Sequence, residues 1–397
     1  MAGADPRTYW APGASLDDAI ARGVASGAPL FAHIYVENRC HLKCAHCYES
    51  EDSHPHEARL SLDDYDRIFD ELAALGVLVL TFSGGEPFLR KDFLDIVERA
   101  RKKRFAVRIY TSGTLLTPAH ADRIRDLRVQ EVHVSVYSSS PDVHDTFTGG
   151  KRSHEKSVRA LALLRERGVH TVLKSNVMTL NVDDIDGLIG LAKSVGADWQ
   201  LDPTIKPKWN GDRSPLRFAV SPEELRDKVL WRADLTSVRS LEDAAGLCDG
   251  ENPRHGQEGG MCAAGKSLVA VWADGQLAPC AMMPKAVATE GRSLVDVFTN
   301  DPLFRAMRGQ RFDDMKKCPT CDVRSTCDPC MAYALVEHGD MTDCNASSRQ
   351  LATGTRLLAE RMARTAKKTA RGRALTVLDP DVDLGKDAGK ARLSAEL

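Results

Sequence analysis

The sequence lacks any long apolar stretch and any strong excess of charge of one sign. No run approaches the roughly 20 consecutive apolar residues that a membrane-spanning helix requires. The 54 Lys and Arg residues nearly balance the 56 Asp and Glu residues, so no bulk attraction to nucleic acid or to a membrane surface is expected. Residues 1–30 also lack the basic segment and the apolar core of a secretory signal. These absences predict a soluble, cytoplasmic protein with neither nucleic acid nor membrane as a partner.

Disulfides are not expected either, although the chain contains 11 cysteines. Without a secretory signal the chain should remain in the reducing cytosol, where clustered cysteines bind metal rather than pair with one another. At 397 residues, with 43% hydrophobic composition, the chain is longer than one typical core requires. We therefore expect two domains.

Three cysteines near the start of the chain carry the most information. Cys40, Cys44 and Cys47 are spaced as Cys-x3-Cys-x2-Cys. Cysteine thiolates are the usual ligands of iron–sulfur clusters, and a cubane [4Fe–4S] cluster has four irons. Three cysteines leave one iron without a protein ligand, and an open coordination position distinguishes a reacting metal site from a structural one. Taken alone, the triplet is also compatible with a zinc knuckle or a chance grouping.

A second motif follows a predicted strand at residues 77–82. Gly84, Gly85, Glu86 and Pro87 end this strand in a tight loop, and glycines let a backbone approach a ligand closely. Together, the cysteine spacing and this Gly-Gly-Glu-Pro segment resemble the radical S-adenosylmethionine (SAM) superfamily. The resemblance implies that SAM occupies the open iron and that an electron from the cluster cleaves it to methionine and a 5′-deoxyadenosyl radical. It also implies that residues 84–87 bind the methionyl amino group of SAM.

Strand and helix patterns alternate between residues 31 and 205. The expected strands are 31–36, 77–82, 105–110, 132–136, 171–177 and 198–201. The first expected helix begins at a capping box formed by Ser61 and Asp64. Further helices are expected at 92–103, 118–127, 155–167 and 182–195. About six β/α units predict an α/β fold with a parallel sheet, and the resemblance specifies a partial (β/α)6 TIM-like barrel. In such barrels the site lies at the carboxyl ends of the strands, where both motifs fall.

Four further residues at strand ends are candidate SAM contacts by the same resemblance. Ser112 stands where relatives often have asparagine in a Thr-Asn-Gly-Thr segment. Ser135 resembles a serine that contacts the ribose, and Lys174 and Asn176 are candidates for the carboxylate or the ribose. Lys174 is equally compatible with an internal salt bridge. No catalytic base or quenching residue beyond the SAM cluster can be named from the sequence.

Two other features near these motifs have a structural interpretation. His46 and Tyr48, which flank Cys47, are expected to fill the loop rather than to take part in the chemistry. Residues 206–215 are rich in turn formers and follow the sixth strand. They are expected to be either a loop that lines the substrate site or a plain linker.

The other eight cysteines form a second constellation, consisting of Cys248, Cys262, Cys280, Cys318, Cys321, Cys327, Cys330 and Cys344. Their spacing resembles the SPASM extension, which carries two auxiliary [4Fe–4S] clusters in many peptide-modifying radical enzymes. One departure is that two residues, rather than the usual three, separate Cys327 from Cys330. A zinc ribbon is the alternative, but its Cys-x2-Cys pairs lie about 15–20 residues apart, whereas five residues separate Cys321 from Cys327.

The SPASM resemblance implies which cysteines act together. Auxiliary cluster I would be held by Cys262, Cys280 and Cys330, with Cys248 either completing the set or remaining free. Auxiliary cluster II would be held by Cys318, Cys321, Cys327 and Cys344. The implied cofactors are therefore three [4Fe–4S] clusters and SAM. Auxiliary clusters can pass electrons, orient the substrate or bind it directly, and ligation by four cysteines favours electron transfer.

The expected organisation has five segments. They are an N-terminal extension (1–30), the radical SAM barrel (31–205), a connector (206–247), a SPASM-like cluster domain (248–346), and a C-terminal helix with a disordered tail (347–397). Relatives with this layout mostly modify ribosomally made peptides by crosslinking, thioether formation or epimerisation. Others modify tetrapyrroles or other small molecules, and a non-enzymatic zinc or iron–sulfur protein is a third hypothesis. Ala281 replaces the aspartate that follows the matching cysteine in sulfatase-maturing enzymes, which argues against formylglycine formation.

The expected partners follow from this chemistry. They are a precursor peptide or small-molecule substrate and an electron donor such as flavodoxin or ferredoxin. Only about 30 residues precede the first strand, too few for a fused leader-binding module. A leader-bearing peptide would therefore need a separate leader-binding protein.

Overall fold

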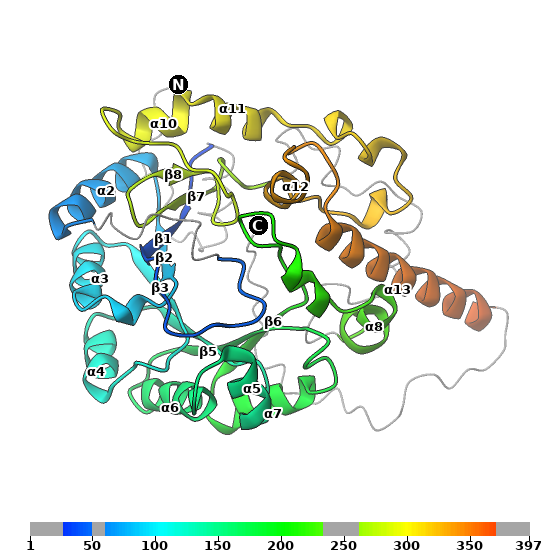
Figure 1. The fold of residues 1–397 in the computed structure, drawn as a ribbon, viewed down its shortest axis with the longest axis horizontal. Coiled ribbons are helices and arrows are strands. Elements are labelled where there is room, and N and C mark those ends of the chain that lie inside the picture. Colours follow the sequence, from blue (N-terminus) through cyan, green and yellow to red (C-terminus); the bar gives the residue numbers. More distant parts are fainter. Residues whose placement is uncertain (1–26, 50–59, 233–261, 371–397) are drawn as a thin grey trace.

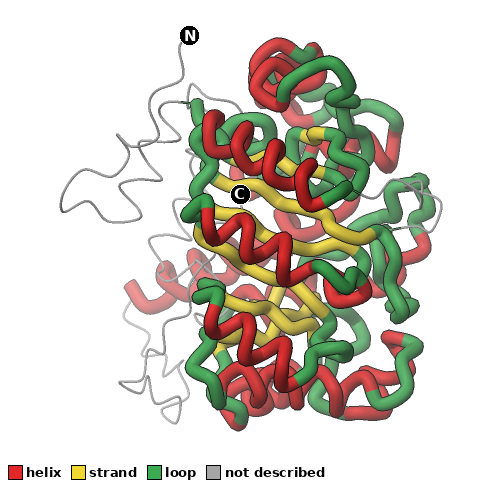
Figure 2. Tube along the Cα trace, turned by 90° about the vertical axis from the view of Figure 1, so that its left-hand side faces the viewer, coloured by secondary structure: helices red, strands yellow, loops and turns green. Residues whose placement is uncertain are grey.

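An eight-stranded sheet organises the computed structural model, which describes residues 27–49, 60–232 and 262–370. The strand order is β6-β5-β4-β3-β2-β1-β7-β8, and β1 to β6 run parallel to one another. Figure 1 shows the sheet curving, with helices along its outer side. Figure 2 shows these helices covering one face of the sheet. The predicted α/β fold with a partial (β/α)6 barrel is confirmed.

The elements of the barrel alternate as the sequence predicts. The strands are β1 (Phe31–Glu37), β2 (Val79–Gly84), β3 (Ala106–Thr111), β4 (Glu131–Ser135), β5 (Thr171–Asn176) and β6 (Asp198–Asp202). The helices are α2 (Leu62–Leu75), α3 (Phe93–Lys102), α4 (Pro118–Asp126), α5 (Pro141–Thr148), α6 (Ser153–Arg165) and α7 (Ile185–Ser194). Every predicted strand and helix of the barrel overlaps an observed one, and α5 is the one element in this list that was not predicted.

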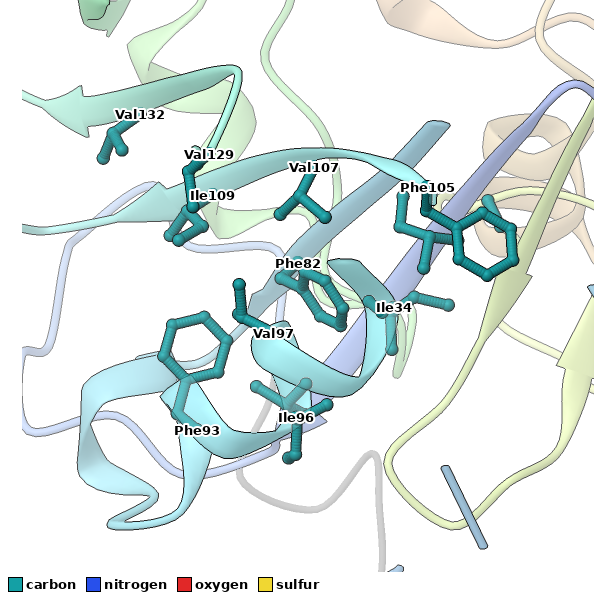
Figure 3. Close-up of a cluster of buried hydrophobic side chains, with 14 of the residues drawn as sticks. Ile34, Phe82, Phe93, Ile96, Val97, Phe105, Val107, Ile109, Val129 and Val132 are labelled. Carbon is teal, nitrogen blue, oxygen red and sulfur yellow. The ribbon is translucent and has the colours of Figure 1, made fainter. Parts of the chain in front are cut away.

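The hydrophobic core lies between the sheet and its helices. Phe82, Val107 and Ile109 alternate along β2 and β3 and are fully buried, facing Phe93 and Val97 of α3 (Figure 3). Burying each such side chain stabilises the fold by about 1.5–3 kcal/mol relative to exposure. Because side chains alternate across a strand, the residues between them point to the opposite, inner face of the sheet. That inner face is where the polar residues of the barrel lie.

A hairpin from the cysteine-rich half of the chain extends the barrel sheet. β7 (Leu268–Val271) pairs in parallel with β1, and β8 (Leu277–Ala278) folds back antiparallel to β7. Gly275 makes the turn with a φ of +86°, a conformation that other residues rarely adopt. Cys280, two residues after β8, is thereby held at the edge of the barrel beside β1. The boundaries predicted for the cluster domain remain predictions.

Four helices follow this hairpin, α10 (Leu294–Asn300), α11 (Pro302–Gly309), α12 (Met331–His338) and α13 (Ala346–Ala370). The long α13 packs against α8 (Pro222–Glu224) and the π-helical η4 (Leu225–Leu230), so the C-terminal helix lies back on the connector (Figure 1). Ser221 caps α8 by accepting from the backbone N–H of Glu224. In the described part of the chain, no helix combines the length and apolarity needed to cross a bilayer.

A charge network occupies the inner face at the start of β4. The Glu131 carboxylate pairs with the Arg108 guanidinium and lies 3.5 Å from the imidazole nitrogens of both His133 and His170. His170 in turn pairs with Asp198 at 2.7 Å. Burial alone would raise the pKa of Glu131, but the hydrogen bond with His133 and the charges of Arg108, His133 and His170 outweigh it and lower the pKa to about 2.

The interactions of Glu131 lead to a prediction about how the free energy of unfolding depends on pH. Because the pKa of Glu131 falls from 4.5 to about 2 on folding, its contribution is fully present above pH 4.5 and is lost as the pH falls toward 2. We expect Glu131→Gln to lower the free energy of unfolding by about 3 kcal/mol at pH 6. Urea titrations of both proteins at pH 6 and pH 3 check this. A difference that does not shrink at the lower pH would contradict it.

Candidate active site

The loop that carries Cys40, Cys44 and Cys47 follows the carboxyl end of β1 and is clamped by the end of α5. The Lys43 N–H donates to the Thr148 carbonyl (2.8 Å), and the Ala45 N–H donates to the Phe147 carbonyl (3.1 Å). Within the loop, the Cys47 N–H donates to the Cys44 carbonyl (3.0 Å). The backbone that carries the three thiols is thus fixed by the end of α5 and by a turn of its own.

The helix that provides this clamp had a boundary signal in the sequence. Pro141 stands at its first turn, and Gly149 ends it in the left-handed conformation, the usual asymmetry of helix ends. At eight residues, α5 is too short for its periodicity to identify it.

The Gly-Gly-Glu-Pro segment lies directly against the start of the cysteine loop. The Gly85 N–H donates to the Glu37 carbonyl (2.7 Å), and the Glu86 N–H donates to the Arg39 carbonyl (3.0 Å). A Cβ on Gly84 would lie 2.1 Å from the Glu37 carbonyl oxygen, and one on Gly85 would lie 2.3 Å from that of Arg39. Both glycines are therefore required for the two loops to meet, apart from any contact with SAM.

Glu86 ties this segment to the end of β3. Its side chain is fully buried, and its carboxylate accepts hydrogen bonds from the Thr111 hydroxyl (2.7 Å), the Ser112 N–H (2.9 Å), the Ser112 hydroxyl (2.6 Å) and the Phe88 N–H (3.2 Å). Ser112, a predicted SAM contact, is thus hydrogen-bonded to another predicted SAM contact. The carboxylate positions both loops.

Replacing Glu86 with glutamine should loosen this arrangement. An amide has one acceptor oxygen in place of two and turns N–H donors toward the Ser112 donors. A buried donor left unsatisfied costs about 1–3 kcal/mol. We expect Glu86→Gln to lower the free energy of unfolding by that amount, measured by urea denaturation against the exposed control Glu223→Gln. Equal stability of the two variants would contradict the role of Glu86.

The other predicted SAM contacts lie on neighbouring strands at the same edge. Ser135 is paired in register with Lys174 across β4 and β5. The Lys174 ammonium lies 4.0 Å from the centroid of the Tyr110 ring. Asn176 donates to the Thr204 carbonyl (3.1 Å) and hydrogen-bonds with His46 of the cysteine loop. Their roles as SAM contacts remain predictions.

His46 fills the loop, as expected. The centroid of its ring lies 4.7 Å from the centroid of the Tyr137 ring and 5.0 Å from that of the Phe147 ring. Burial lowers the pKa of His46 to about 4, with Lys206 adding to the effect against the hydrogen bond of Asn176. His46 is therefore neutral at pH 7.

The other described cysteines fall into two groups whose thiols interact electrostatically. Burial, followed by the charges of Cys262 and Cys330, raises the pKa of Cys280. Burial raises the pKa of Cys327 to about 12, and the charges of Cys318, Cys344 and Cys321 add to this effect. The SPASM resemblance implies the same two sets, whose roles as cluster ligands remain predictions. Cys248 lies outside the described residues.

The second of these groups lines one pocket. Cys318, Cys321, Cys327 and Cys344 all line this pocket, together with neighbouring residues such as Phe312, Val323 and Arg324. Among the described residues, no three His, Cys, Asp or Glu side chains converge closely enough to hold a single metal ion. A cubane cluster needs wider spacing because each thiolate binds its own iron. Buried thiols also need a cation before they ionise, so both groups fit a cluster.

One feature of the site had no signal in the sequence. Tyr35, Tyr48, Trp209 and Trp272 meet between the cysteine loop and Cys280, with ring centroids 5.2–5.9 Å apart along the series. We call these four residues the aromatic cluster. They come from four separate segments, so no local pattern could predict their meeting.

Comparison with known proteins agrees with this geometry. Residues 34–193 match the family model described as Radical SAM superfamily. An AdoMet-dependent heme synthase of Methanosarcina barkeri is 26% identical over 322 residues, covering 76% of this chain and 90% of that protein. A PqqA peptide cyclase of Granulibacter bethesdensis is 25% identical over 318 residues, covering 77% of this chain and 84% of that protein.

Solved structures share the fold. Streptococcus suis SuiB bound to precursor peptide SuiA covers 82% of this chain and 76% of that chain, with a TM-score of 0.64 at 17% identity. Native anSMEcpe with bound AdoMet covers 86% of this chain and 100% of that chain, with a TM-score of 0.60 at 18% identity.

Residues 34–193 therefore form a radical SAM domain, and the similarity to this family and to these relatives supports an enzyme. Its relatives include both AdoMet-dependent heme synthases and PqqA peptide cyclases. The family implies a [4Fe–4S] cluster and SAM as cofactors.

Proposed function

We propose that this enzyme cleaves SAM reductively and abstracts hydrogen from a ribosomally made peptide. The observation that carries the proposal is the clamped loop of Cys40, Cys44 and Cys47, which lies against residues 84–87 at the carboxyl edge of the sheet. When bound, the cluster and SAM would supply a 5′-deoxyadenosyl radical at this edge. The chain's own residues hold the thiols in place and bring the glycine segment to them.

We assign the cysteines to three separate clusters. Cys40, Cys44 and Cys47 would hold the cluster that binds SAM, because three thiols leave one iron open. Cys262, Cys280 and Cys330, with Cys248 as the candidate fourth ligand, would hold a second cluster at the edge of the sheet. Cys318, Cys321, Cys327 and Cys344 would hold a third near α13.

The substrate class rests on the relatives. The similarity to a PqqA peptide cyclase extends over 77% of this chain, more than the barrel alone, and the fold is that of SuiB, which has been solved with a precursor peptide bound. Both favour a peptide. The electron donor and a leader-binding protein are proposed as partners.

A tetrapyrrole is the second candidate substrate. Two AdoMet-dependent heme synthases match this chain over 88–90% of their own length, as completely as the peptide cyclase does. Planar tetrapyrroles also suit a site walled by aromatic rings.

Isotope transfer distinguishes these candidates. We would incubate the reconstituted, reduced enzyme with SAM and one of two deuterated compounds, a peptide encoded beside this gene or Fe-coproporphyrin III. Hydrogen abstraction carries deuterium into 5′-deoxyadenosine, which mass spectrometry detects. Deuterium from the peptide supports the proposal, deuterium from the porphyrin alone supports the second candidate, and deuterium from neither contradicts both.

A further inference from the structure

The aromatic cluster forms a wall between the cysteine loop and the group of Cys262, Cys280 and Cys330. Its ring centroids lie 5.9 Å apart for Tyr35 and Trp209, 5.2 Å for Tyr48 and Trp209, and 5.7 Å for Trp209 and Trp272. Tyr48 directly follows Cys47 in the sequence, whereas Tyr35 and Trp272 belong to the same buried cluster as Cys280. The wall therefore spans from one set of thiols to the next.

Hydrogen bonds hold the two tyrosine rings and tie the backbone of Trp209 to the cysteine loop. The Tyr35 hydroxyl donates to the Ala281 carbonyl (2.9 Å) and lies 3.3 Å from the Tyr48 hydroxyl. The Trp209 N–H donates to the Tyr48 carbonyl (3.0 Å), so the connector is attached to the cysteine loop. Tyr35 and Trp272 are buried, and Tyr48 and Trp209 are partly exposed. Of the four rings, these two therefore keep some surface open to solvent.

A lysine lies at the exposed end of this wall. The Lys206 ammonium lies 5.2 Å from the centroid of the Tyr48 ring. Its charge acts on His46 of the cysteine loop and on Cys330 of the next thiol group, so the ammonium lies near both. No carboxylate in the described part of the chain forms an ion pair with Lys206. By contrast Lys208, two residues along, pairs with Asp212 at 2.7 Å.

We infer that Lys206, Tyr48 and Trp209 form a substrate subsite for a planar or aromatic group that bears a carboxylate. This inference rests on the proposed function, because it specifies the substrate of the same site. An ammonium without a carboxylate partner favours an anion nearby, and ring faces favour a flat apolar group. On this inference residues 206–215 are a substrate-lining loop, one of the two alternatives that the sequence left open for this segment.

Two sources share this ligand chemistry. A peptide presents it as an aromatic residue near a glutamate or aspartate, and a tetrapyrrole presents it as a macrocycle with propionate groups. Either would place its flat group on Trp209 and its carboxylate at Lys206, beside the loop of Cys40, Cys44 and Cys47.

Calorimetric titration of the reconstituted full chain in the presence of SAM tests the inference. The probes are coproporphyrin III and the peptide acetyl-Glu-Ala-Ala-Tyr-amide, each compared with an uncharged counterpart, the tetramethyl ester and the Gln peptide. We expect at least one probe to bind, and its uncharged counterpart to bind about tenfold or more weakly, the loss of one charge-assisted contact. Lys206→Met and Trp209→Leu should weaken binding similarly, and Lys206→Arg should restore it.

Matched controls separate this subsite from general effects. Lys208→Met removes a nearby lysine that is already paired, and Trp231→Leu removes a tryptophan that is 53% exposed. Both should bind the probe as the wild type does, and melting temperatures show that each variant is folded. Binding that is unchanged in Lys206→Met, or absent for both probes, overturns the inference. If the wild type still cleaves SAM in either case, the proposed radical chemistry stands and only the subsite fails.

Discussion

Replacing Cys44 with alanine should abolish the formation of 5′-deoxyadenosine from SAM. Cys44 lies in the middle of the thiol triplet, and its backbone carbonyl accepts from Cys47. Burial, followed by the charge of Cys40, raises the pKa of its thiol to about 12, so a thiolate at this position needs a bound cation. Loss of residues that only support metal ligands costs about 10–100-fold, and loss of a ligand itself should cost more.

The measurement for Cys44→Ala is the rate of 5′-deoxyadenosine release under a strong reductant, together with the iron content. Lys43→Ala is the matched control, because the Lys43 side chain is exposed and its backbone bond to Thr148 is kept. We expect the control to retain iron and activity. Full activity in Cys44→Ala would remove the basis for the radical mechanism.

Adding a single methyl group at Gly85 should displace the cysteine loop. The new Cβ would lie 2.3 Å from the Arg39 carbonyl oxygen and 2.9 Å from that of Asn38. Both neighbours are backbone atoms, so the loop itself must shift. Such overpacking costs about 1–3 kcal/mol, and a displacement of about 1 Å near the reacting centre costs about 100-fold in rate.

Gly85→Ala is measured by urea denaturation and by the rate of SAM cleavage. The control is Gly190→Ala, since Gly190 lies within α7 with no atom near its missing Cβ. Alanine there should raise the free energy of unfolding by about 0.5–1 kcal/mol. If Gly85→Ala cleaves SAM at the wild-type rate, close packing of the two loops does not require glycine.

Local sequence patterns predicted the barrel well because its elements are regular. The alternation of strand and helix patterns located β1 to β6, and Ser61 caps α2 through the predicted capping box with Asp64. The helix expected from residue 182 begins instead at Ile185. There, the Asn181 side chain accepts from the Met178 N–H and holds a turn before the helix.

Contacts between distant segments were not predictable from local patterns. β7 and β8 are only four and two residues long, and their pairing with β1 depends on the tertiary fold. Glu86 was expected to bind SAM, but the structure shows that it is also the acceptor for Ser112, 26 positions away. The aromatic cluster combines residues as far apart as Tyr35 and Trp272, so only the folded chain brings it together.

The most direct test is SAM cleavage by the anaerobically reconstituted, reduced protein, with iron and zinc measured on the same sample. We expect methionine and 5′-deoxyadenosine in equal amounts and about 12 irons per chain, as three cubane clusters require. About 8 irons would retain the radical chemistry and remove one auxiliary cluster. Zinc in place of iron, with no cleavage of SAM, would contradict the assignment of this protein's chemistry.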